Sequence, residues 1–323
     1  MVRWRKMSTD TDYVVDKRGA GPSRGRRRNQ AGGLGGGGGG LGGLGGLAKG
    51  AGGGTMMLIL VGFLLLQMCT GGGSGLDIGS GLQGAGAPSP DFDAMEEVDA
   101  TKDEDEEFME AILDDLNGYW EEVFVENDIT YEPVFMTLFE GGVSSNCGGA
   151  TSAIGPHYCP LVDQGSGNRF MYIDLSFFEQ MESEMGAPGD FARAYVIAHE
   201  AGHHVQTLLG TSDEVRQRSA ANSGEANGLS VRQELQADCY AGAWANALVD
   251  QDILDPGDAD EALGAAAAVG DDRLLEAAGR EVDTESFTHG SSAQRIRWFT
   301  IGMESGSPGD CDTFGVSDSE VGL

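Results

Sequence analysis

Lysine is scarce in most of this 323-residue chain, and after residue 70 the sequence contains only Lys102. The part after residue 70 holds ten Lys and Arg against 49 Asp and Glu, a net charge of −39. The first 70 residues hold ten against three, a net charge of +7. So acidic a main domain repels phosphate, which argues against nucleic acid as its partner. The acidity suits a high-salt environment, where screening removes self-repulsion, or simply serves solubility.

Cysteine is also rare, with five residues and no C-x-x-C pair, which disfavours a structural Cys/His zinc site. Cys147 and Cys159 enclose a short loop, whereas Cys239 and Cys311 lie far apart in the sequence. In an extracytoplasmic domain these four cysteines can form the disulfides Cys147–Cys159 and Cys239–Cys311. Cys69 is then left over near the membrane, and the three residues before it make a poor lipobox, which disfavours lipid attachment.

The chain has one marked apolar run, at residues 55–70. Its core is short for a bilayer about 30 Å thick, which needs about 20 apolar residues, but uncharged neighbours can extend it. A cleaved signal peptide is the competing interpretation, although a long segment precedes the run and no A-x-A site follows it. Because the positive charge lies on its N-terminal side, we expect a single-pass anchor in the cell membrane, with the N-terminus cytoplasmic and the main domain extracytoplasmic.

Composition divides the chain into a basic and glycine-rich cytoplasmic segment, a transmembrane anchor, a linker and a main domain, at residues 1–54, 55–70, 71–100 and 101–323. Apolar periodicity in the main domain predicts helices near 103–124, 190–210, 230–248 and 292–303 and two shorter helical pieces within 258–279. It also predicts a strand at 130–140 and a strand that runs into a helix at 169–181. These elements indicate an α+β fold that is mostly helical with a small sheet.

The motif His199-Glu200-Ala201-Gly202-His203 lies in a predicted helix that Asp190 caps at its start and Gly210 ends. Histidines four residues apart on a helix lie about 40° apart around its axis, so their rings converge on one point. Zinc needs such a pair of neutral imidazoles, and Glu200 can deprotonate the metal's water. The alternative is a helix whose polar side chains face solvent.

The next predicted helix, which Ser230 caps, supplies candidates to complete the site. A catalytic zinc usually has three protein ligands and a water. Glu234 and Asp238 are four residues apart and therefore share a face. We assign Glu234 as the third zinc ligand and Asp238 as the acceptor that orients a ligating imidazole. A solvated acidic face is the alternative, but the surrounding residues are those of a buried helix.

Three further histidines are less direct candidates. His289 precedes a helix that Ser292 is predicted to cap, and it can donate an N–H to a developing oxyanion or simply brace the helix start. His204 points about 100° away from His203, so we expect it to pack or form hydrogen bonds. His157 lies in the loop between two cysteines, where a structural role is expected.

Several stretches together resemble the bacterial family named "putative neutral zinc metallopeptidase", the group including YpfJ. They are MVRWRK, NCGGATSAIGPHYCP, MYIDLSFF, AHEAGHHVQ, ELQADCYAGAWA, FTHGSSAQRIRWF and CDTF. The resemblance implies a membrane-anchored, zincin-like fold of gluzincin type, with zinc on His199, His203 and Glu234 and with Glu200 as base. The spacing from His203 to Glu234 is longer than in thermolysin, and the His289 segment is similar to that of HtpX-like membrane peptidases. The glycine tether and the acidity depart from the family pattern.

These features predict a membrane-anchored zinc endopeptidase acting on protein or peptide substrates. Glu200 takes a proton from the zinc-activated water, which attacks the peptide carbonyl, and then passes the proton to the leaving nitrogen. The competing hypothesis is a non-enzymatic envelope scaffold in which zinc holds the fold or a partner surface. An intact Glu200 favours the enzyme, because a structural zinc does not need it. The sequence does not indicate an oligomeric state.

Overall fold

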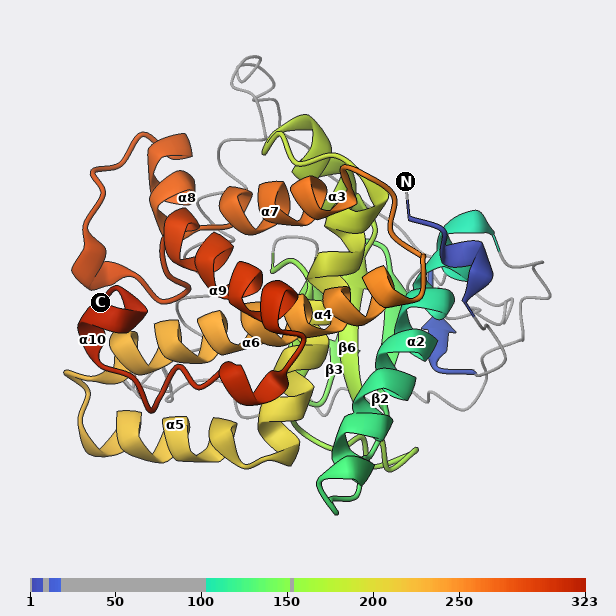
Figure 1. The fold of residues 1–323 in the computed structure, drawn as a ribbon, viewed down its shortest axis with the longest axis horizontal. Helices are drawn as coiled ribbons and strands as arrows, with labels where there is room; N and C mark the ends of the chain where they lie inside the picture. Colours follow the sequence, from blue (N-terminus) through green and yellow to red (C-terminus); the bar gives the residue numbers. More distant parts are fainter. Residues whose placement is uncertain (1, 8–11, 19–102, 152–153) are drawn as a thin grey trace, which may run out of the picture.

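The structure is a computed structural model that describes residues 2–7, 12–18, 103–151 and 154–323 (Figure 1). The predicted glycine tether, membrane anchor and linker lie outside these described residues, and the predicted domain boundaries remain predictions. Within the described ranges, no helix is both long enough and apolar enough to cross a bilayer.

Four strands form the main sheet, in the order β1-β2-β6-β5. Their bounds are Val14–Asp16 for β1, Val134–Phe139 for β2, Arg169–Asp174 for β6 and His157–Cys159 for β5. Strands β1, β2 and β6 run parallel, and β5 runs antiparallel to β6 at the edge of the sheet. Strands β3 (Gly142–Ser145) and β4 (Gly148–Thr151) form a separate antiparallel hairpin. The β-branched and aromatic residues of β2 and β6 account for their strand conformation.

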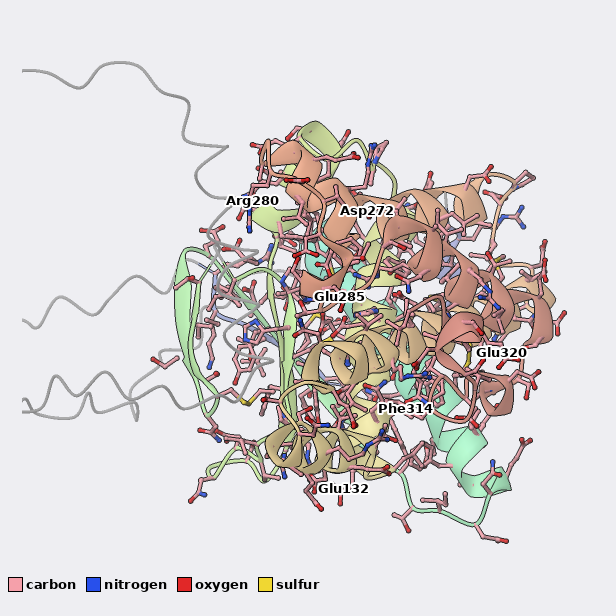
Figure 2. The ribbon with its side chains drawn as sticks, turned by 90° about the vertical axis from the view of Figure 1, so that its left-hand side faces the viewer. Glu132, Asp272, Arg280, Glu285, Phe314 and Glu320 are labelled. Atoms are coloured by element: carbon pink, nitrogen blue, oxygen red, sulfur yellow. A yellow bond between two sulfur atoms is a disulfide. The ribbon has the colours of Figure 1, made fainter. Side chains whose placement is uncertain are left out.

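Helices make up most of the remaining described chain, which confirms the predicted α+β fold with a small sheet. They are α2 (Glu104–Glu126), α3 (Ser176–Ser183), α4 (Asp190–Leu208), α5 (Thr211–Ala221), α6 (Ala226–Asp250), α7 (Asp258–Ala268), α8 (Asp271–Ala277), α9 (Ser292–Ser305) and α10 (Asp318–Val321), with the 3₁₀ turns Trp4–Lys6, Thr284–Ser286 and Pro308–Asp310. In Figure 2 the green strands lie at one side of the view, and the orange and red helices lie at the other.

Helix α4 is central to the core and packs against α6, α7, α2 and β5. Phe191, Ala194, Tyr195 and Ala198 recur at helical spacing on one face of α4, and all four are buried. Helices α6 and α9 form the most extensive contact between two helices. The site therefore lies within packed helices and not on a loop.

Small residues let these helices approach closely at two crossings. A Cβ added to Gly202 of α4 would lie 3.0 Å from the Cα atom of Ala237 in α6. A Cβ on Gly302 of α9 would overlap the carbonyl oxygen of Cys239 in α6, and one on Gly242 would overlap that of Phe299. The glycines thus set the separation of the three helices that carry the site.

The helix starts correct three predictions. Asp190 does not cap α4: Gly189 occupies that position, and Glu261 of α7 accepts the N–H of Phe191 at 3.0 Å. Helix α6 begins at Ala226, so Ser230 lies one turn inside it. Ser291 and not Ser292 caps α9, forming a capping box with Gln294, because the Ser292 hydroxyl donates to the carbonyl oxygen of Ala267.

Several ordered elements were not predicted. Strands β4 and β5 lie in the stretch between Cys147 and Cys159 that was expected to be a loop, and β3, α10, α5 and the N-terminal residues were also missed. Helix α5 buries none of its side chains, so it has no apolar stripe for sequence analysis to detect. Residues 2–7 and 12–18, assigned from sequence to the cytoplasmic segment, lie against the main domain in the structure. Val2 and Trp4 belong to its hydrophobic core, and β1 extends its sheet.

We expect Gly302→Ala to destabilise the protein, because the added methyl forces α9 away from α6. Overpacking of this kind typically costs about 1–3 kcal/mol or more in the free energy of unfolding. Gly118 of α2 provides a matched control, since it is exposed and no neighbouring atom lies within 4 Å of the position that an added Cβ would take. Gly118→Ala should stabilise by about 0.5–1 kcal/mol through helix propensity. Thermal melting of both variants checks this, and equal melting temperatures would contradict it.

Candidate metal and catalytic site

The structure brings the three predicted metal ligands together. His199 and His203 come from successive turns of α4, and Glu234 comes from the facing turn of α6. The His199 Nε2 atom lies 3.1 Å from Glu234 Oε2, and His203 Nε2 lies 3.4 Å from Glu234 Oε1. One potential ligand atom from each residue lies within 4.8 Å of the others. The close crossing at Gly202 and Ala237 produces this convergence.

His199 is oriented by Asp238, as predicted. Its Nδ1 lies 2.8 Å from Asp238 Oδ1, which leaves Nε2 directed toward Glu234. Asp238 is fully buried and also pairs with Arg295 of α9, at 2.8 Å from Nε to Oδ2 and 2.9 Å from Nη2 to Oδ1. The Tyr195 hydroxyl donates to the same Oδ1 at 2.5 Å. The predicted orienting role of Asp238 thus belongs to a buried network of four side chains.

His203 is oriented by a glutamine that the sequence analysis did not identify. Its Nδ1 lies 2.9 Å from Gln206 Oε1, which leaves Nε2 on the Glu234 side. The Gln206 amide donates to the carbonyl oxygen of Gln233 and to Gln236 Oε1, at 2.7 and 3.1 Å. Gln236 in turn donates to the carbonyl oxygen of Cys311. Each histidine therefore has one ring nitrogen fixed and the other free to bind a metal.

Burial and charge oppose each other in these groups. Burial lowers the pKa of His199, but Asp238 and Glu234 outweigh it and raise that pKa to about 9. Burial raises the pKa of Glu234, yet His203 and His199 bring it well below its ordinary value. For Asp238, burial is outweighed by Arg295 and His199, so its pKa is also lowered. Both carboxylates are therefore ionised, the form in which a carboxylate binds metal.

The donor set fits a zinc ion. Two imidazoles and one carboxylate form a typical set of protein ligands for catalytic zinc. Tetrahedral ligands at about 2.0–2.1 Å lie about 3.3–3.4 Å from one another. The two ligand separations of 3.1 and 3.4 Å given above match this spacing closely. The third separation, between ring nitrogens of His199 and His203, is within 4.8 Å.

Glu200 lies beside the ligands without being tied to another group. It is 8% exposed, and no hydrogen bond or ion pair engages its carboxylate within the described part of the chain. Its charge is near enough to His203 to contribute to raising the pKa of that imidazole. A nearly buried carboxylate next to a metal site, with its oxygens unengaged, can accept a proton from water.

His289 lies close to the ligands, where Asp271 holds it. His289 Nδ1 lies 3.1 Å from Asp271 Oδ1, while Asp271 Oδ2 accepts the backbone N–H groups of Thr288, His289 and Gly290. Burial lowers the pKa of His289, but Asp271 and Glu234 raise it overall. A Cβ built at the neighbouring Gly290 would lie 3.3 Å from Val231 and 3.4 Å from Leu235, so this segment packs against the part of α6 that carries Glu234. Asp271 braces the backbone directly, so the His289 ring is not needed for that purpose.

The other two histidines are not brought to the site. His204 Nε2 lies 2.6 Å from the carbonyl oxygen of Glu132, and Nδ1 lies 3.1 Å from the Tyr158 hydroxyl. Burial lowers its pKa to about 4, so its ring is neutral. His157 lies in β5 and stacks on Tyr172. Both have the structural roles expected from sequence.

A second acidic group, formed by Asp190, Asp258 and Glu261, does not resemble a metal site. Asp258 and Asp190 are the first residues of α7 and α4, where negative charge favours the positive end of the helix dipole. Asp258 Oδ2 accepts the N–H of Asp255, and Glu261 accepts that of Phe191. Glu261 thus accepts an N–H from the first turn of α4, and Asp258 accepts one from the loop before α7.

Both predicted disulfides are present. Cys147–Cys159 links the turn of the β3–β4 hairpin to β5, and Cys239–Cys311 links α6 to the C-terminal segment. Cys239 directly follows Asp238, and the carbonyl oxygen of Cys311 accepts from Gln236. The second disulfide therefore fixes the segment that supports the hydrogen bonds behind His203.

We expect Asp238→Asn to weaken zinc binding by about 10–100-fold, because the amide no longer fixes the His199 ring through a charged acceptor. The variant also leaves Arg295 without its buried counter-charge, so it should melt at a lower temperature. Competition with a chromophoric chelator measures the affinity. Asp115→Asn is the control, since Asp115 accepts from Trp244 and takes no part in the site. Wild-type affinity in Asp238→Asn would contradict the orienting role.

Comparisons with known proteins agree with this chemistry. The family model described as "Putative neutral zinc metallopeptidase" matches residues 2–314. The chain is 42% identical over 255 residues to the uncharacterized protein YpfJ of Escherichia coli K12, covering 79% of this chain and 86% of YpfJ. It is 43% identical over 207 residues to the uncharacterized protein Mb2605 of Mycobacterium bovis, covering 58% of this chain and 64% of that protein.

No solved structure matches the chain. The family match extends over nearly the whole sequence, and zinc is the cofactor expected for its members. The chain belongs to the putative neutral zinc metallopeptidase family.

Proposed function

We propose that the protein is a zinc-dependent endopeptidase of zincin-like, gluzincin type that uses Glu200 as its general base. The observation that supports this best is the convergence of His199, His203 and Glu234 around one point, with the unengaged carboxylate of Glu200 beside it. A purely structural metal site would leave no task for Glu200. Family membership supports peptidase chemistry in general terms.

The three ligands would hold zinc, which when bound polarises a peptide carbonyl and makes a water molecule more acidic. Glu200 accepts the proton of the attacking water and then delivers it to the leaving nitrogen. Asp238 and Gln206 keep the two ligating imidazoles in the required orientation throughout. The Arg295 charge keeps Asp238 ionised, so the orienting hydrogen bond persists.

His289 is proposed to stabilise the negative charge that develops on the carbonyl oxygen. Asp271 fixes its Nδ1 side, so Nε2 is the nitrogen available to a substrate. Burial lowers the pKa of His289, but Asp271 and Glu234 raise it overall, which favours the protonated ring. Such a ring can donate to an oxyanion.

The substrate is proposed to bind along β5. This strand forms one edge of the main sheet, and in the described part of the chain it pairs with β6 alone. It contacts α4 directly, and its Tyr158 hydroxyl meets His204, the neighbour of the ligand His203. An extended peptide can add to such an edge through main-chain hydrogen bonds, largely independent of its sequence. This arrangement suits an endopeptidase.

We further propose that the domain works at the membrane, outside the cytoplasm. The apolar run at residues 55–70 would attach it, and both disulfides are of the kind that persist in oxidising compartments. An oxidising location also agrees with the cysteine content, because Cys69 is the one cysteine of the sequence outside the two pairs.

Glu200→Gln should keep the fold and the zinc but lower the rate of peptide cleavage by about 10²–10⁴-fold, because the amide cannot accept the water's proton. Zinc content, thermal melting and digestion of a peptide library measure the three properties in one preparation. The control is Glu214→Gln, whose side chain is 70% exposed and lies on α5, outside the group of ligands. A His199→Ala, His203→Ala variant should retain no stoichiometric zinc. Cleavage at the wild-type rate by Glu200→Gln would refute the mechanism.

His289→Ala should reduce kcat by about 10²–10³-fold while zinc content and melting temperature change little. The backbone before α9 remains held by Asp271, whose Oδ2 accepts three N–H groups. Steady-state kinetics and thermal melting separate the two possible roles of His289. A lower melting temperature with an unchanged kcat would show that His289 only braces the start of the helix.

A further inference from the structure

Strand β1, near the start of the chain, forms the edge of the sheet opposite β5. Val14, Val15 and Asp16 of β1 pair in parallel with residues 136–138 of β2. The pairing continues beyond the strand, because the N–H of Met136 donates to Tyr13 and the N–H of Lys17 donates to Leu138, at 2.9 and 2.8 Å. These two bonds extend the backbone pairing with β2 by one residue at each end of β1.

The residues before β1 are packed into the core. Val2 and Trp4 are 3% and 8% exposed, and the Trp4 ring meets Phe108 of α2 edge to face at 5.8 Å. The N–H of Arg3 donates to the carbonyl oxygen of Ile253 at 2.9 Å, and the Arg3 side chain pairs with Asp252 and Asp255. Figure 1 shows these blue N-terminal pieces beside α2.

Residues 18 and 103 are in direct contact. Arg18, the last described residue before the gap, pairs with Asp103, the first described residue after it, at 3.0 Å. Arg18 is only 12% exposed at its side chain and also approaches Glu106 at 3.9 Å. Asp103 is the N-cap of α2 and accepts the N–H of Glu106. Arg18 therefore contacts the first turn of α2 through its N-cap residue, Asp103.

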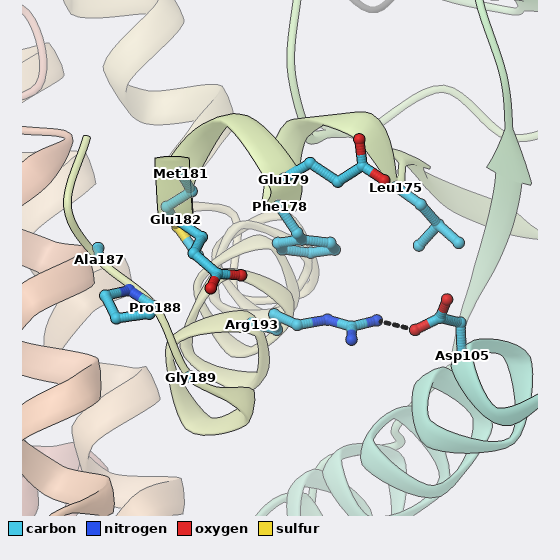
Figure 3. A pocket seen from close by; sticks show the side chains of 10 residues that line it. All are labelled: Asp105, Leu175, Phe178, Glu179, Met181, Glu182, Ala187, Pro188, Gly189 and Arg193. Atoms are coloured by element: carbon cyan, nitrogen blue, oxygen red, sulfur yellow. Dashed lines mark hydrogen bonds and ion pairs between the residues drawn. The ribbon is translucent and has the colours of Figure 1, made fainter. Parts of the chain in front are cut away.

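The start of α2 is held on its other side by α4. Figure 3 shows Arg193 reaching Asp105, at 2.8 Å, across a cavity of about 150 Å³ beside α3. The Arg193 guanidinium also lies over the rings of Phe108 and Phe178. Because α4 carries the HExxH motif, the helix that the N-terminal residues contact is fixed directly to the metal-binding helix.

We infer that residues 2–18 are a structural part of the peptidase domain and occupy the same compartment as residues 103–323. A segment crossing a membrane once would place its two ends about 30 Å apart on opposite sides. Arg18 and Asp103, in ion-pair contact, cannot satisfy that condition. The inference is an alternative to the single-pass arrangement with a cytoplasmic N-terminus that the charge distribution predicts.

Cysteine labelling in spheroplasts tests the shared compartment. In a Cys69→Ser full-length chain, Asp12→Cys places a thiol on an exposed N-terminal residue, and Val125→Cys places one at a residue that is 64% exposed. A membrane-impermeant maleimide should label both sites in intact spheroplasts, or both only after permeabilisation. The Cys69→Ser parent gives the background, and denatured samples give total labelling. Labelling of one site from outside and of the other only after permeabilisation would overturn the inference.

Thermal melting of the purified full chain tests the packing independently. Trp4→Ala should lower the melting temperature by about 6–20 °C, the range expected when a buried tryptophan is truncated in a domain of this size. Asp12→Ala is the matched control and should melt like wild type, because Asp12 is exposed. A Trp4→Ala protein that melts with the wild type would overturn the inference, whatever the zinc content or cleavage activity.

Discussion

The buried carboxylate of Asp238 is the interaction on which the rest of the site depends. Its two oxygens hold Tyr195 and His199 of α4 and Arg295 of α9, so one side chain joins three helices. A buried ion costs several kcal/mol unless it is paired and fully hydrogen-bonded. Arg295 meets that requirement only if α9 lies very close to α6. The glycines at the crossing of these helices, Gly242 and Gly302, are therefore part of the metal site's construction although they touch none of its ligands.

The sequence predicted the parts of the site that depend on local spacing. His199, His203, Glu234 and Asp238 follow from a four-residue repeat on two helices, and such a repeat is visible without any knowledge of tertiary structure. Arg295, Gln206 and Asp271 were missed for the opposite reason. Each acts through a partner on another turn, helix or loop, and an arginine or glutamine on an amphipathic helix most often faces solvent. The resemblance to the family covered the Arg295 stretch without giving that residue a role.

The contrast between local spacing and distant partners also explains which helices and strands were predicted correctly. The buried helices and the strands β2 and β6 carry strong apolar patterns, and both types were predicted with small boundary errors. Helix α5 has no buried face, and β1 is three residues long and pairs with a strand about 120 positions later. Capping was misplaced where tertiary structure provides the partner: Glu261 reaches α4 from α7, and Ser292 bonds to Ala267, which leaves Ser291 as the cap. Local signals do not report partners that distant.

Two adjacent histidines link the metal site to the sheet. His203 faces Glu234 and α6, whereas His204, about 100° further around α4, bonds to Glu132 and Tyr158 on the sheet side. Burial keeps the His204 ring neutral, so it can both donate and accept in that position. Tyr158 lies in β5, and the disulfide at Cys159 ties the same strand to the neighbouring hairpin. The position of the metal ligands relative to the proposed substrate strand is thereby set by two adjacent residues of α4, and any change that displaces His204 should shift the substrate relative to Glu200.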